Sequence, residues 1–323
     1  MKALRVLSYD PNDSIHVVDL PDRPPKPGEV RVSVHACGVS FVDLLLARGK
    51  YQVKPALPFT PGSEFAGIVS AIGEGIDEQL RVGDAVCGTF GGAWSASICV
   101  PRHAILSMPG GRPIAEGSVL VAPFSTALYA VRDRAHLLRG ETLLVLGAAG
   151  AVGSAAVQIG RALGAQVIAV ASSDAKRNAA LADGADHVVD SQSEWKDVVK
   201  NLTGPRGVDV VFDPVGGDAT DQAFRTLGWG GRHLMVGFAG GSIAGLKTNL
   251  AIVKGSSLVG VDLRQAAERN PELILGVKND VLALYKSRQI RVNIRHSVPA
   301  EHIAEAEQLM KDRSLVGRVI ITF

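Results

Sequence analysis

A chain of 323 residues is longer than one hydrophobic core usually supports, so its length predicts two domains. A formal net charge of +2, without a basic run, excludes the electrostatic footprint of a nucleic-acid-binding protein. Three cysteines without Cys-x-x-Cys spacing suggest neither a disulfide framework nor a structural zinc site, and they fit a reducing cytoplasm.

Residues 1–123 predict a small β-rich barrel made of short strands separated by proline and glycine. The chain opens on the strand-like MKALRVL, without an apolar signal core, so we expect a cytoplasmic protein that is not exported. From Glu29 to Ala36 apolar side chains recur at every second position, which is typical of a half-buried strand. Glycine-bounded strands are also expected at Phe65–Ile72 and Asp84–Thr89.

Residues 124–262 change to alternating strands and helices, which predicts a doubly wound parallel sheet of the α/β class. The first strand is the apolar run Leu143–Leu146, and the second ends near Ala171. Four further strands are expected at 186–190, 208–213, 232–237 and 257–261. Residues 263–323 predict two helices and a last strand, and we expect this tail to rejoin the first domain, leaving a cleft between the two domains.

A glycine-rich turn joins the first two strands of this sheet. Gly147, Gly150 and Gly153 allow a sharp turn, a close approach to a pyrophosphate and close packing of the following helix. With Ala149, Ala151 and Val152 they would present backbone N–H groups to the phosphates. The strand, turn, helix and strand context therefore predicts a dinucleotide site.

The sequence of this turn also allows two other interpretations. A glycine-rich connection between apolar strands can be purely structural. Residues 142–160 also lack charge, but four glycines in that window favour a buried turn over a membrane-spanning helix.

The end of the second strand bears on which dinucleotide binds. An NAD site usually carries an acidic residue there, whereas this chain has Ser172 and Ser173 followed by Lys176 and Arg177. Hydroxyl donors and cations suit a 2′-phosphate, so we predict NADPH over NADH. In the alternative interpretation Ser172 caps the next helix and the two cations are a solvated face, which Asp174 leaves open.

Motifs along nearly the whole chain resemble those of medium-chain dehydrogenases/reductases, in particular the zinc-free, zeta-crystallin-like quinone oxidoreductases. They are HACGVSFVDLLLARGKY, LPFTPGSEFAG, RVGDAV, GAAGAVGSAAVQIGRALGA, GADHVVD, GVDVVFDPVGG, GGRHLMVGFAGG and VGRVIIT. The resemblance implies a GroES-like catalytic domain, a Rossmann domain that binds NADPH, and a homodimer formed through the Rossmann sheet edge at residues 257–261.

Zinc-dependent members of this superfamily have cysteine, histidine and cysteine ligands at three points. This chain has Ser40, Ser63 and Ala122 there, which are poor zinc ligands. The four-cysteine lobe that binds structural zinc in relatives is absent too. His35 and Cys37 are interpreted as core and surface neighbours on a strand, so we expect no metal.

Without a Lewis acid, hydride transfer needs an electron-poor acceptor such as a quinone or an α,β-unsaturated carbonyl. By the resemblance, the candidate catalytic residues are Ser40, Tyr51, Asp43 and Glu64. Quinone oxidoreductases commonly have asparagine in place of Ser40. Thr126 and the segment Gly237, Phe238 and Ala239 are expected to hold the nicotinamide, and Asn249 and Arg318 match cofactor-side positions.

Two alternative functions remain. One is an enone, enoyl thioester or acryloyl-CoA reductase of the same superfamily, for which Arg48, Lys50 and Lys54 are candidate contacts to a CoA phosphate. The other is a non-catalytic NADPH-binding protein, similar to relatives that serve as lens crystallins or bind RNA. Neither nucleic-acid nor membrane binding is expected.

Overall fold

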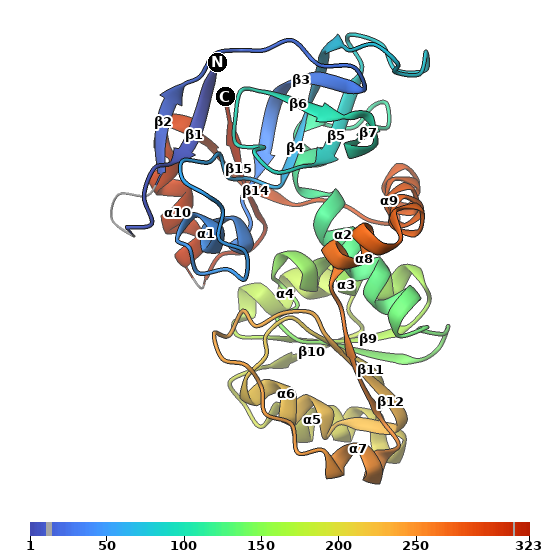
Figure 1. Cartoon of the computed structure of the whole chain (residues 1–323). Coiled ribbons are helices and arrows are strands. Elements are labelled where there is room, and N and C mark those ends of the chain that lie inside the picture. The colour runs from blue at the N-terminus through green and yellow to red at the C-terminus, as the bar shows by residue number, and fades with distance from the viewer. Residues whose placement is uncertain (11–14, 313) are drawn as a thin grey trace. The chain divides into compact units, whose positions relative to one another are not determined.

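The computed structural model describes residues 1–10, 15–312 and 314–323, and these residues divide into two compact units (Figure 1). The first unit is made of two chain segments, Met1–Ala122 and Val292–Phe323. The second unit is continuous, from Pro123 to Arg291.

The described part of the first unit contains a seven-stranded, largely antiparallel sheet and a separate two-stranded hairpin. The sheet order is β14-β15-β3-β4-β5-β7, and β6 pairs with β3. Its strands are β3 (Glu29–Gly38), β4 (Glu64–Ile72), β5 (Ala85–Thr89), β6 (Ser97–Pro101), β7 (Ile105–Ser107), β14 (Ile294–Pro299) and β15 (Arg318–Thr322). The hairpin consists of β1 (Lys2–Val6) and β2 (Ile15–Asp19). This sheet confirms the expected β-rich first domain.

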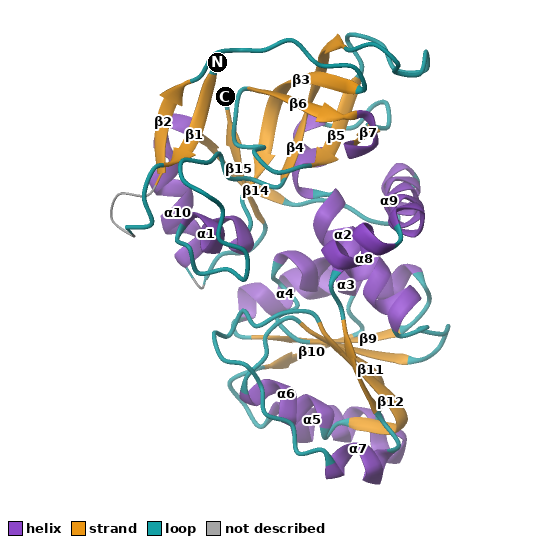
Figure 2. Ribbon diagram, in the orientation of Figure 1, coloured by secondary structure: helices purple, strands orange, loops and turns teal. Residues whose placement is uncertain are grey.

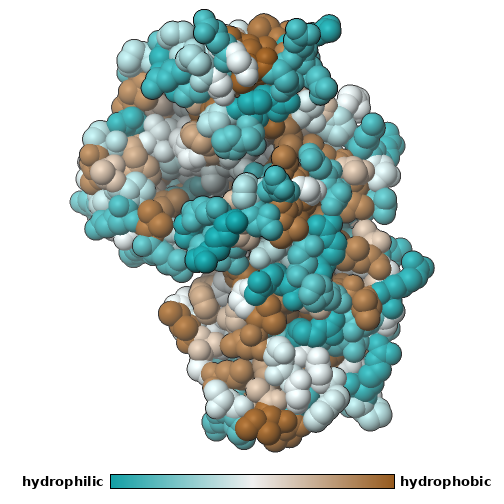
Figure 3. Space-filling model, turned by 45° about the vertical axis from the view of Figure 1, so that its right-hand side comes forward, coloured by the Kyte–Doolittle hydropathy of each residue, from teal (hydrophilic) through white to brown (hydrophobic). Residues whose placement is uncertain are grey.

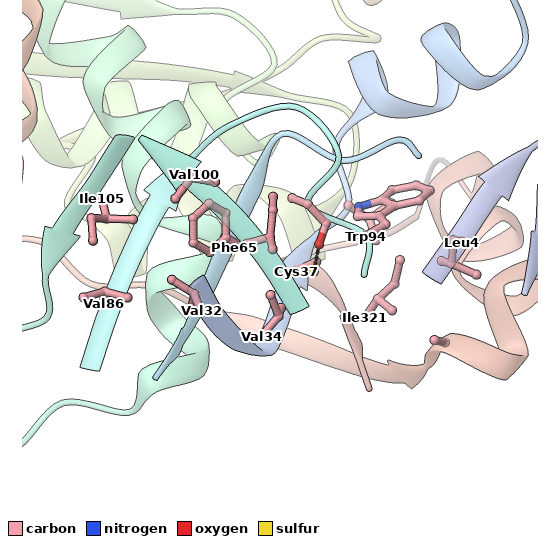
Figure 4. Packing of buried hydrophobic residues seen from close by; sticks show 14 of the residues in the cluster. Leu4, Val32, Val34, Cys37, Phe65, Val86, Trp94, Val100, Ile105 and Ile321 are labelled. Atoms are coloured by element: carbon pink, nitrogen blue, oxygen red, sulfur yellow. Dashed lines mark hydrogen bonds between the residues drawn. The ribbon is translucent and has the colours of Figure 1, made fainter. Parts of the chain in front are cut away.

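The core of the first unit is built on the alternation of β3. Val30, Val32 and Val34 are buried, and the intervening residues are more exposed, as the period of two predicts. Figure 4 shows Val32 and Val34 among the other buried side chains of this core. Each fully buried valine contributes about 1.5–3 kcal/mol of transfer free energy. Trp94 is also fully buried, and its indole N–H donates to the carbonyl of Gly38 at 2.9 Å. The alternation of valines therefore determines which face of β3 packs against the core.

Short helices complete the first unit. They are α1 (Phe41–Ala47), α10 (Ile303–Lys311) and the 3₁₀ turns η1 (Arg102–Ala104), η2 (Ile114–Val119) and η5 (Ala300–His302). Helix α2 (Val121–Leu128) crosses the boundary between the units and continues into a π-helical turn, η3 (Tyr129–Arg134).

The second unit contains a six-stranded parallel sheet among the described residues, with the order β10-β9-β8-β11-β12-β13. Its strands are β8 (Thr142–Val145), β9 (Gln166–Ala171), β10 (His187–Asp190), β11 (Val208–Asp213), β12 (Leu227–Met235) and β13 (Ser257–Gly260). The order reverses between β8 and β11, and this switch point is where doubly wound sheets bind ligands. The predicted α/β class and doubly wound sheet are confirmed.

Helices cover both faces of this sheet. In Figures 1 and 2, α3 (Ala151–Ala162) and α4 (Asp174–Asp183) lie on one face, and α5 (Trp195–Thr203) and α6 (Asp218–Phe224) lie on the other. The unit also contains η4 (Gly204–Arg206), α7 (Asn249–Lys254), α8 (Leu263–Arg269) and α9 (Pro271–Lys286). No helix in the described ranges is both long enough and apolar enough to cross a membrane.

The C-terminal tail divides at a later point than the expected boundary after residue 262. Helices α8 and α9 belong to the second unit, and the chain returns to the first unit only at Val292. Asp280 of α9 accepts a 2.7 Å hydrogen bond from Arg132, and the Arg291 amide donates to Gln158 on α3 at 2.8 Å. These hydrogen bonds attach residues 263–291 to the second unit.

Candidate functional site

The glycine-rich turn between β8 and α3 forms one candidate site. Gly147 has a φ of +56°, a conformation that glycine adopts without strain. A Cβ at Gly153 would lie 2.2 Å from the carbonyl oxygen of Gly147, so a side chain there would push α3 away from the turn. Gly150 occupies the N-cap of α3, and no side chain of the described residues caps this end. The first N–H groups of α3 and the positive end of its dipole are thus available to an anion.

The loop after β12 reaches the same edge of the sheet. The amide of Ala239 donates to the carbonyl of Pro214 at 3.0 Å, in the loop after β11. That loop in turn places Val215 Cγ2 3.1 Å from the position of a Cβ at Gly147. The structure therefore brings the expected cofactor residues Gly147, Ala149–Gly153 and Gly237–Ala239 to neighbouring loops, joined through Val215.

The segment expected to set dinucleotide preference begins α4. Ser173, and not Ser172, is the N-cap, because its hydroxyl accepts from the Lys176 amide, while Ser172 is exposed. The Arg177 guanidinium donates to Asp174 and lies 3.1 Å from the carboxylate of Asp190 at the end of β10. Arg177 is therefore committed to two ion pairs, and the part of Ser172 and Lys176 in binding a 2′-phosphate stays a prediction.

Two other cofactor candidates lie elsewhere in this part of the chain. Thr126 is half-buried on α2. Asn249 begins α7, which packs against β12, and its side chain is exposed. The role of Asn249 in cofactor binding stays a prediction.

A buried polar cluster in the first unit contains three of the four candidate catalytic residues. Ser40 caps α1 in a reciprocal arrangement with Asp43: the Asp43 amide donates to Ser40 Oγ at 3.1 Å, and the Ser40 amide donates to Asp43 Oδ2 at 3.0 Å. The Ser40 hydroxyl also donates to Asp43 Oδ2 at 2.6 Å. Asp43 is only 1% exposed, and its Oδ1 has no hydrogen-bond partner among the described residues.

Glu64 and Arg318 complete this cluster. Glu64 Oε1 accepts from the Ala122 amide at 2.7 Å, and its Oε2 lies 4.0 Å from Arg318 Nη2. Burial raises the pKa of Glu64 to about 7, although Arg318 and the Ala122 amide oppose this rise. Burial likewise raises the pKa of Asp43, against the hydrogen bonds from Ser40. Two carboxyl groups thus share one guanidinium, which favours keeping a proton in the cluster near neutral pH.

Arg318 and Tyr51 lie in surroundings that the sequence did not indicate. The Arg318 side chain is 12% exposed and pairs with Glu64 within the first unit, and the cofactor-side role that the resemblance implies for it stays a prediction. Tyr51 is half-buried in the irregular segment between α1 and β4, and its part in acceptor binding stays a prediction. Neither position could be read from residue spacing.

Two of the three basic residues proposed to contact a CoA phosphate already interact with other side chains. Arg48 forms an ion pair with Glu307 at 3.1 Å, and the Lys54 ammonium lies 4.6 Å from the centre of the Tyr9 ring. Lys50 is exposed. Two of the three cations therefore already have partners, which weakens this feature as support for a CoA thioester.

The chemistry of the side chains does not fit a catalytic zinc. Ser40 and Ser63 offer neutral hydroxyls, Ala122 offers none, and the Ser40 hydroxyl is engaged with Asp43. Within residues 1–10, 15–312 and 314–323, no group of three or more His, Cys, Asp and Glu side chains is arranged to hold a metal ion.

Asp213 and His233 form a second buried polar pair that the sequence analysis did not single out. The ring Nε2 of His233 lies 3.0 Å from Asp213 Oδ2, and both side chains are fully buried. The only signal in the sequence was that Asp213 ends a predicted apolar strand, at the edge where doubly wound sheets bind ligands.

The fold and the glycine turn define a two-domain protein of the dinucleotide-binding dehydrogenase class. Residues 26–110 match the family model "Alcohol dehydrogenase GroES-like domain", and residues 151–276 match "Zinc-binding dehydrogenase". The chain is 36% identical over 309 residues to the quinone oxidoreductase-like protein 2 of Bos taurus, covering 95% of this chain and 88% of that protein. It therefore belongs to the medium-chain dehydrogenase/reductase family, among the quinone oxidoreductase-like proteins.

Solved structures with the same architecture agree with this assignment. A probable oxidoreductase from Mycobacterium abscessus has a TM-score of 0.89 and 33% identity, with 100% of this chain and 99% of that chain covered. A mycobacterial protein solved in complex with NADPH has a TM-score of 0.91 and 27% identity, with both chains covered completely. The likeness extends over both units of the chain.

Proposed function

We propose that this protein transfers a hydride from NADPH to a quinone or a similar electron-poor conjugated carbonyl, without zinc. The proposal depends on one observation: the chain combines a complete dinucleotide-binding turn with poor zinc ligands at the usual zinc positions. The dinucleotide turn is complete, whereas the three positions at which related enzymes hold catalytic zinc are Ser40, Ser63 and Ala122. An enzyme of this kind must use an acceptor that is already activated toward hydride.

The residues of the second unit are suited to hold NADPH. The free N–H groups of Ala151, Val152 and Gly153 would bind the pyrophosphate at the start of α3. Ser172 and Lys176 would bind the 2′-phosphate through a hydroxyl and a cation. Thr126 and the Gly237–Ala239 loop would orient the nicotinamide, whose C4 supplies the hydride. The complex of the mycobacterial relative with NADPH supports this choice of cofactor.

Ser40 is proposed to donate a hydrogen bond, and then its proton, to the oxygen of the acceptor. While Asp43 is ionised, the Ser40 proton points to Asp43 Oδ2 at 2.6 Å. If Asp43 takes up a proton, it becomes the donor to Ser40 Oγ, and the Ser40 proton is then free to bond the acceptor oxygen. Hydride addition leaves an anionic oxygen, which takes the Ser40 proton, while Ser40 takes the proton of Asp43. Burial raises the pKa of Asp43, which favours this protonated state.

Two further roles belong to the same proposal. Tyr51 would line the acceptor pocket of the first unit. Burial raises the pKa of Glu64 to about 7, so Glu64 would hold a proton beside Arg318 in part of the molecules at neutral pH. Each carboxyl group therefore acts through its proton and not through a metal.

We also propose that the protein acts as a homodimer. Strand β13 is the last strand at one edge of the described sheet, and its Leu258 side chain is exposed. Trp229 is 83% exposed and Ile252 is 82% exposed, and Val253 on α7 is exposed with them. Figure 3 shows hydrophobic surface at the lower end of the second unit, where α7 lies. An open strand edge flanked by large apolar side chains suits a second copy of the same chain.

The proposed setting is the cytoplasm. The three cysteines are free thiols in the structure, and Cys37 and Cys87 are buried. Free thiols of this kind suit a reducing compartment.

The test is a direct assay with the purified protein after treatment with a chelator. NADPH or NADH is supplied, and the loss of nicotinamide absorbance is followed on adding 1,4-benzoquinone, 9,10-phenanthrenequinone, a simple enone or crotonyl-CoA. Fast oxidation of NADPH by the quinones, unaffected by chelation, is the expected result. Preference for the enone or thioester would move the assignment to double-bond reduction. Binding of NADPH without any turnover would instead indicate a non-catalytic protein.

A further inference from the structure

Asp213 ends β11, next to the switch point of the parallel sheet, and its carboxylate is fully enclosed by donors. Oδ1 accepts from the amides of Val215 and Gly216, each at 2.9 Å. Oδ2 accepts from the Thr220 hydroxyl at 2.6 Å and lies 3.0 Å from His233 Nε2. Burial opposes ionisation, but the bonds from His233, Thr220 and the Gly216 amide hold the pKa of Asp213 below its usual value.

The backbone of Asp213 holds a second loop. Its carbonyl oxygen accepts from the amides of Val236 at 2.9 Å and Gly237 at 3.3 Å, where the chain leaves β12. The side chain of Asp213 therefore fixes the loop after β11, and its main chain fixes the start of the loop after β12. One residue organises both loops at this edge of the sheet.

The two loops are also bonded to each other and packed against the glycine turn. The amide of Ala239 donates to Pro214 at 3.0 Å, and the amide of Gly240 donates to Val215 at 2.8 Å. Val215 Cγ2 lies 3.1 Å from the position of a Cβ at Gly147. A shift of the Asp213 loop would thus move the Gly237–Ala239 segment, which is bonded to it.

His233 fixes the orientation of the carboxylate. An ionised carboxylate only accepts hydrogen bonds, so the proton of a neutral His233 ring lies on Nε2. Nδ1 is buried without a partner in the described structure, and the ring stacks on Phe224 with centroids 5.9 Å apart. His233 is held as a fixed single donor.

We propose that Asp213 is a positioning residue for the nicotinamide end of NADPH, with Thr220 and His233 as its supports. The inference rests on the proposed function, because it requires the Gly237–Ala239 loop to contact the nicotinamide. It adds that the geometry of this loop is set from β11, by a carboxylate that does not itself touch the cofactor. The adenosine end of the cofactor does not depend on this carboxylate.

The test compares Asp213→Asn with a matched control on the same strand, Asp209→Asn. Asp209 lies at the opposite end of β11, where its carboxylate accepts from the Thr142 amide at 2.7 Å and from Arg206 at 3.0 Å. Both changes remove a carboxylate that braces backbone. Steady-state KM and kcat are measured for NADPH and for the acceptor. Affinities are measured for NADPH and for adenosine 2′,5′-bisphosphate, which lacks the nicotinamide.

For Asp213→Asn we expect kcat/KM for NADPH to fall about tenfold or more, since two of the four donors lose their acceptor. Affinity for adenosine 2′,5′-bisphosphate should stay within about twofold of the parent. Asp209→Asn should lower the melting temperature and leave both cofactor measurements unchanged. A role limited to stability would instead change both variants alike, and that result would overturn the inference.

Thr220→Val is the second variant and covers the case in which Asp213→Asn does not fold. It removes one donor to Oδ2 at similar volume, and kcat/KM for NADPH should fall about threefold with unchanged bisphosphate affinity. Parent-like kinetics in Thr220→Val would then count against the inference. If the parent protein neither binds NADPH nor oxidises it, the proposed function fails first, and this inference falls with it.

Discussion

The hydroxyl of Ser40 makes two hydrogen bonds to Asp43: Ser40 Oγ donates to the carboxylate Oδ2 at 2.6 Å and accepts from the Asp43 backbone amide at 3.1 Å. The same hydroxyl therefore caps α1 and contacts a buried carboxyl group. A change at Ser40 should affect both the stability of the first unit and the proposed chemistry, and the two effects can be separated.

Ser40→Ala should lower the free energy of unfolding by about 1 kcal/mol, because the first turn of α1 loses its cap. It should also lower kcat severalfold while leaving NADPH affinity unchanged. Asn270→Ala is the control, since Asn270 caps α9 by accepting from the Leu273 amide at 3.1 Å. The control should cost similar stability and leave kcat intact. Urea denaturation and steady-state kinetics measure the two effects, and equal kcat in both variants would leave Ser40 with a structural role alone.

Glu64→Gln should flatten the pH dependence of stability. Burial raises the pKa of Glu64 in the folded protein to about 7, above its value in the unfolded chain. The favourable contribution of its protonated form is therefore complete below about pH 4.5 and is lost as the pH rises through 7. The loss is on the order of 3 kcal/mol. Urea midpoints from pH 4 to 8 check this, with exposed Glu78→Gln as the control that keeps the parent slope. Parallel curves for parent and Glu64→Gln would contradict it.

Gly153→Ala and Gly150→Ala should differ sharply. A Cβ at Gly153 would lie 2.2 Å from the Gly147 carbonyl oxygen, whereas a Cβ at Gly150 would lie 3.2 Å from the same atom. The first change should displace α3 from the turn and weaken NADPH binding by about tenfold or more, and the second should weaken it far less. Quenching of protein fluorescence by NADPH measures both affinities. Equal affinities would show that the turn does not bind the pyrophosphate.

Lys176→Glu should raise KM for NADPH far more than KM for NADH, because a carboxylate would repel the 2′-phosphate. A ratio of about tenfold is expected at low ionic strength. Lys200→Glu, at an exposed position on α5, makes the same charge change and should leave the ratio unaltered. If both variants raise the two KM values equally, the preference for NADPH comes from other residues.

Leu258→Asp should convert the proposed dimer to a monomer. A charge in the exposed side chain of β13 would have to be buried against the partner strand at considerable cost. Sedimentation velocity of the parent and the variant measures the change, and Leu138→Asp offers a control at another exposed leucine. A parent protein that sediments as a monomer would overturn the proposed assembly directly.

The sequence predicted most of the second unit because its strands are short apolar runs with a clear order. Leu143–Leu146 and Val208–Asp213 nearly coincide with β8 and β11. The boundary at residue 262 was less accurate, since the attachment of α9 depends on a bond between Asp280 and Arg132 that spacing does not reveal. Contacts between distant segments set such boundaries.

Residues of the candidate site were predictable only where a local motif carries them. The glycine turn is a local feature, and its geometry is as expected. The partnership of Arg318 with Glu64 requires β3 to pair with both β15 and β4. The contact of His233 with Asp213 requires β11 and β12 to align Val211 opposite His233. Side chains that meet through strand register leave no mark in the linear sequence.

The first unit is assembled from two segments of chain on either side of the second. Its β15 completes the pairing of β3, and Glu301 near the end forms an ion pair with Lys2 near the start. During synthesis the continuous second unit can therefore fold while the first unit still lacks β14 and β15, and the edge of β3 stays open until β15 emerges. A chain truncated after Arg291 would thus contain a complete nucleotide-binding fold attached to an incomplete first unit with an open, aggregation-prone strand edge.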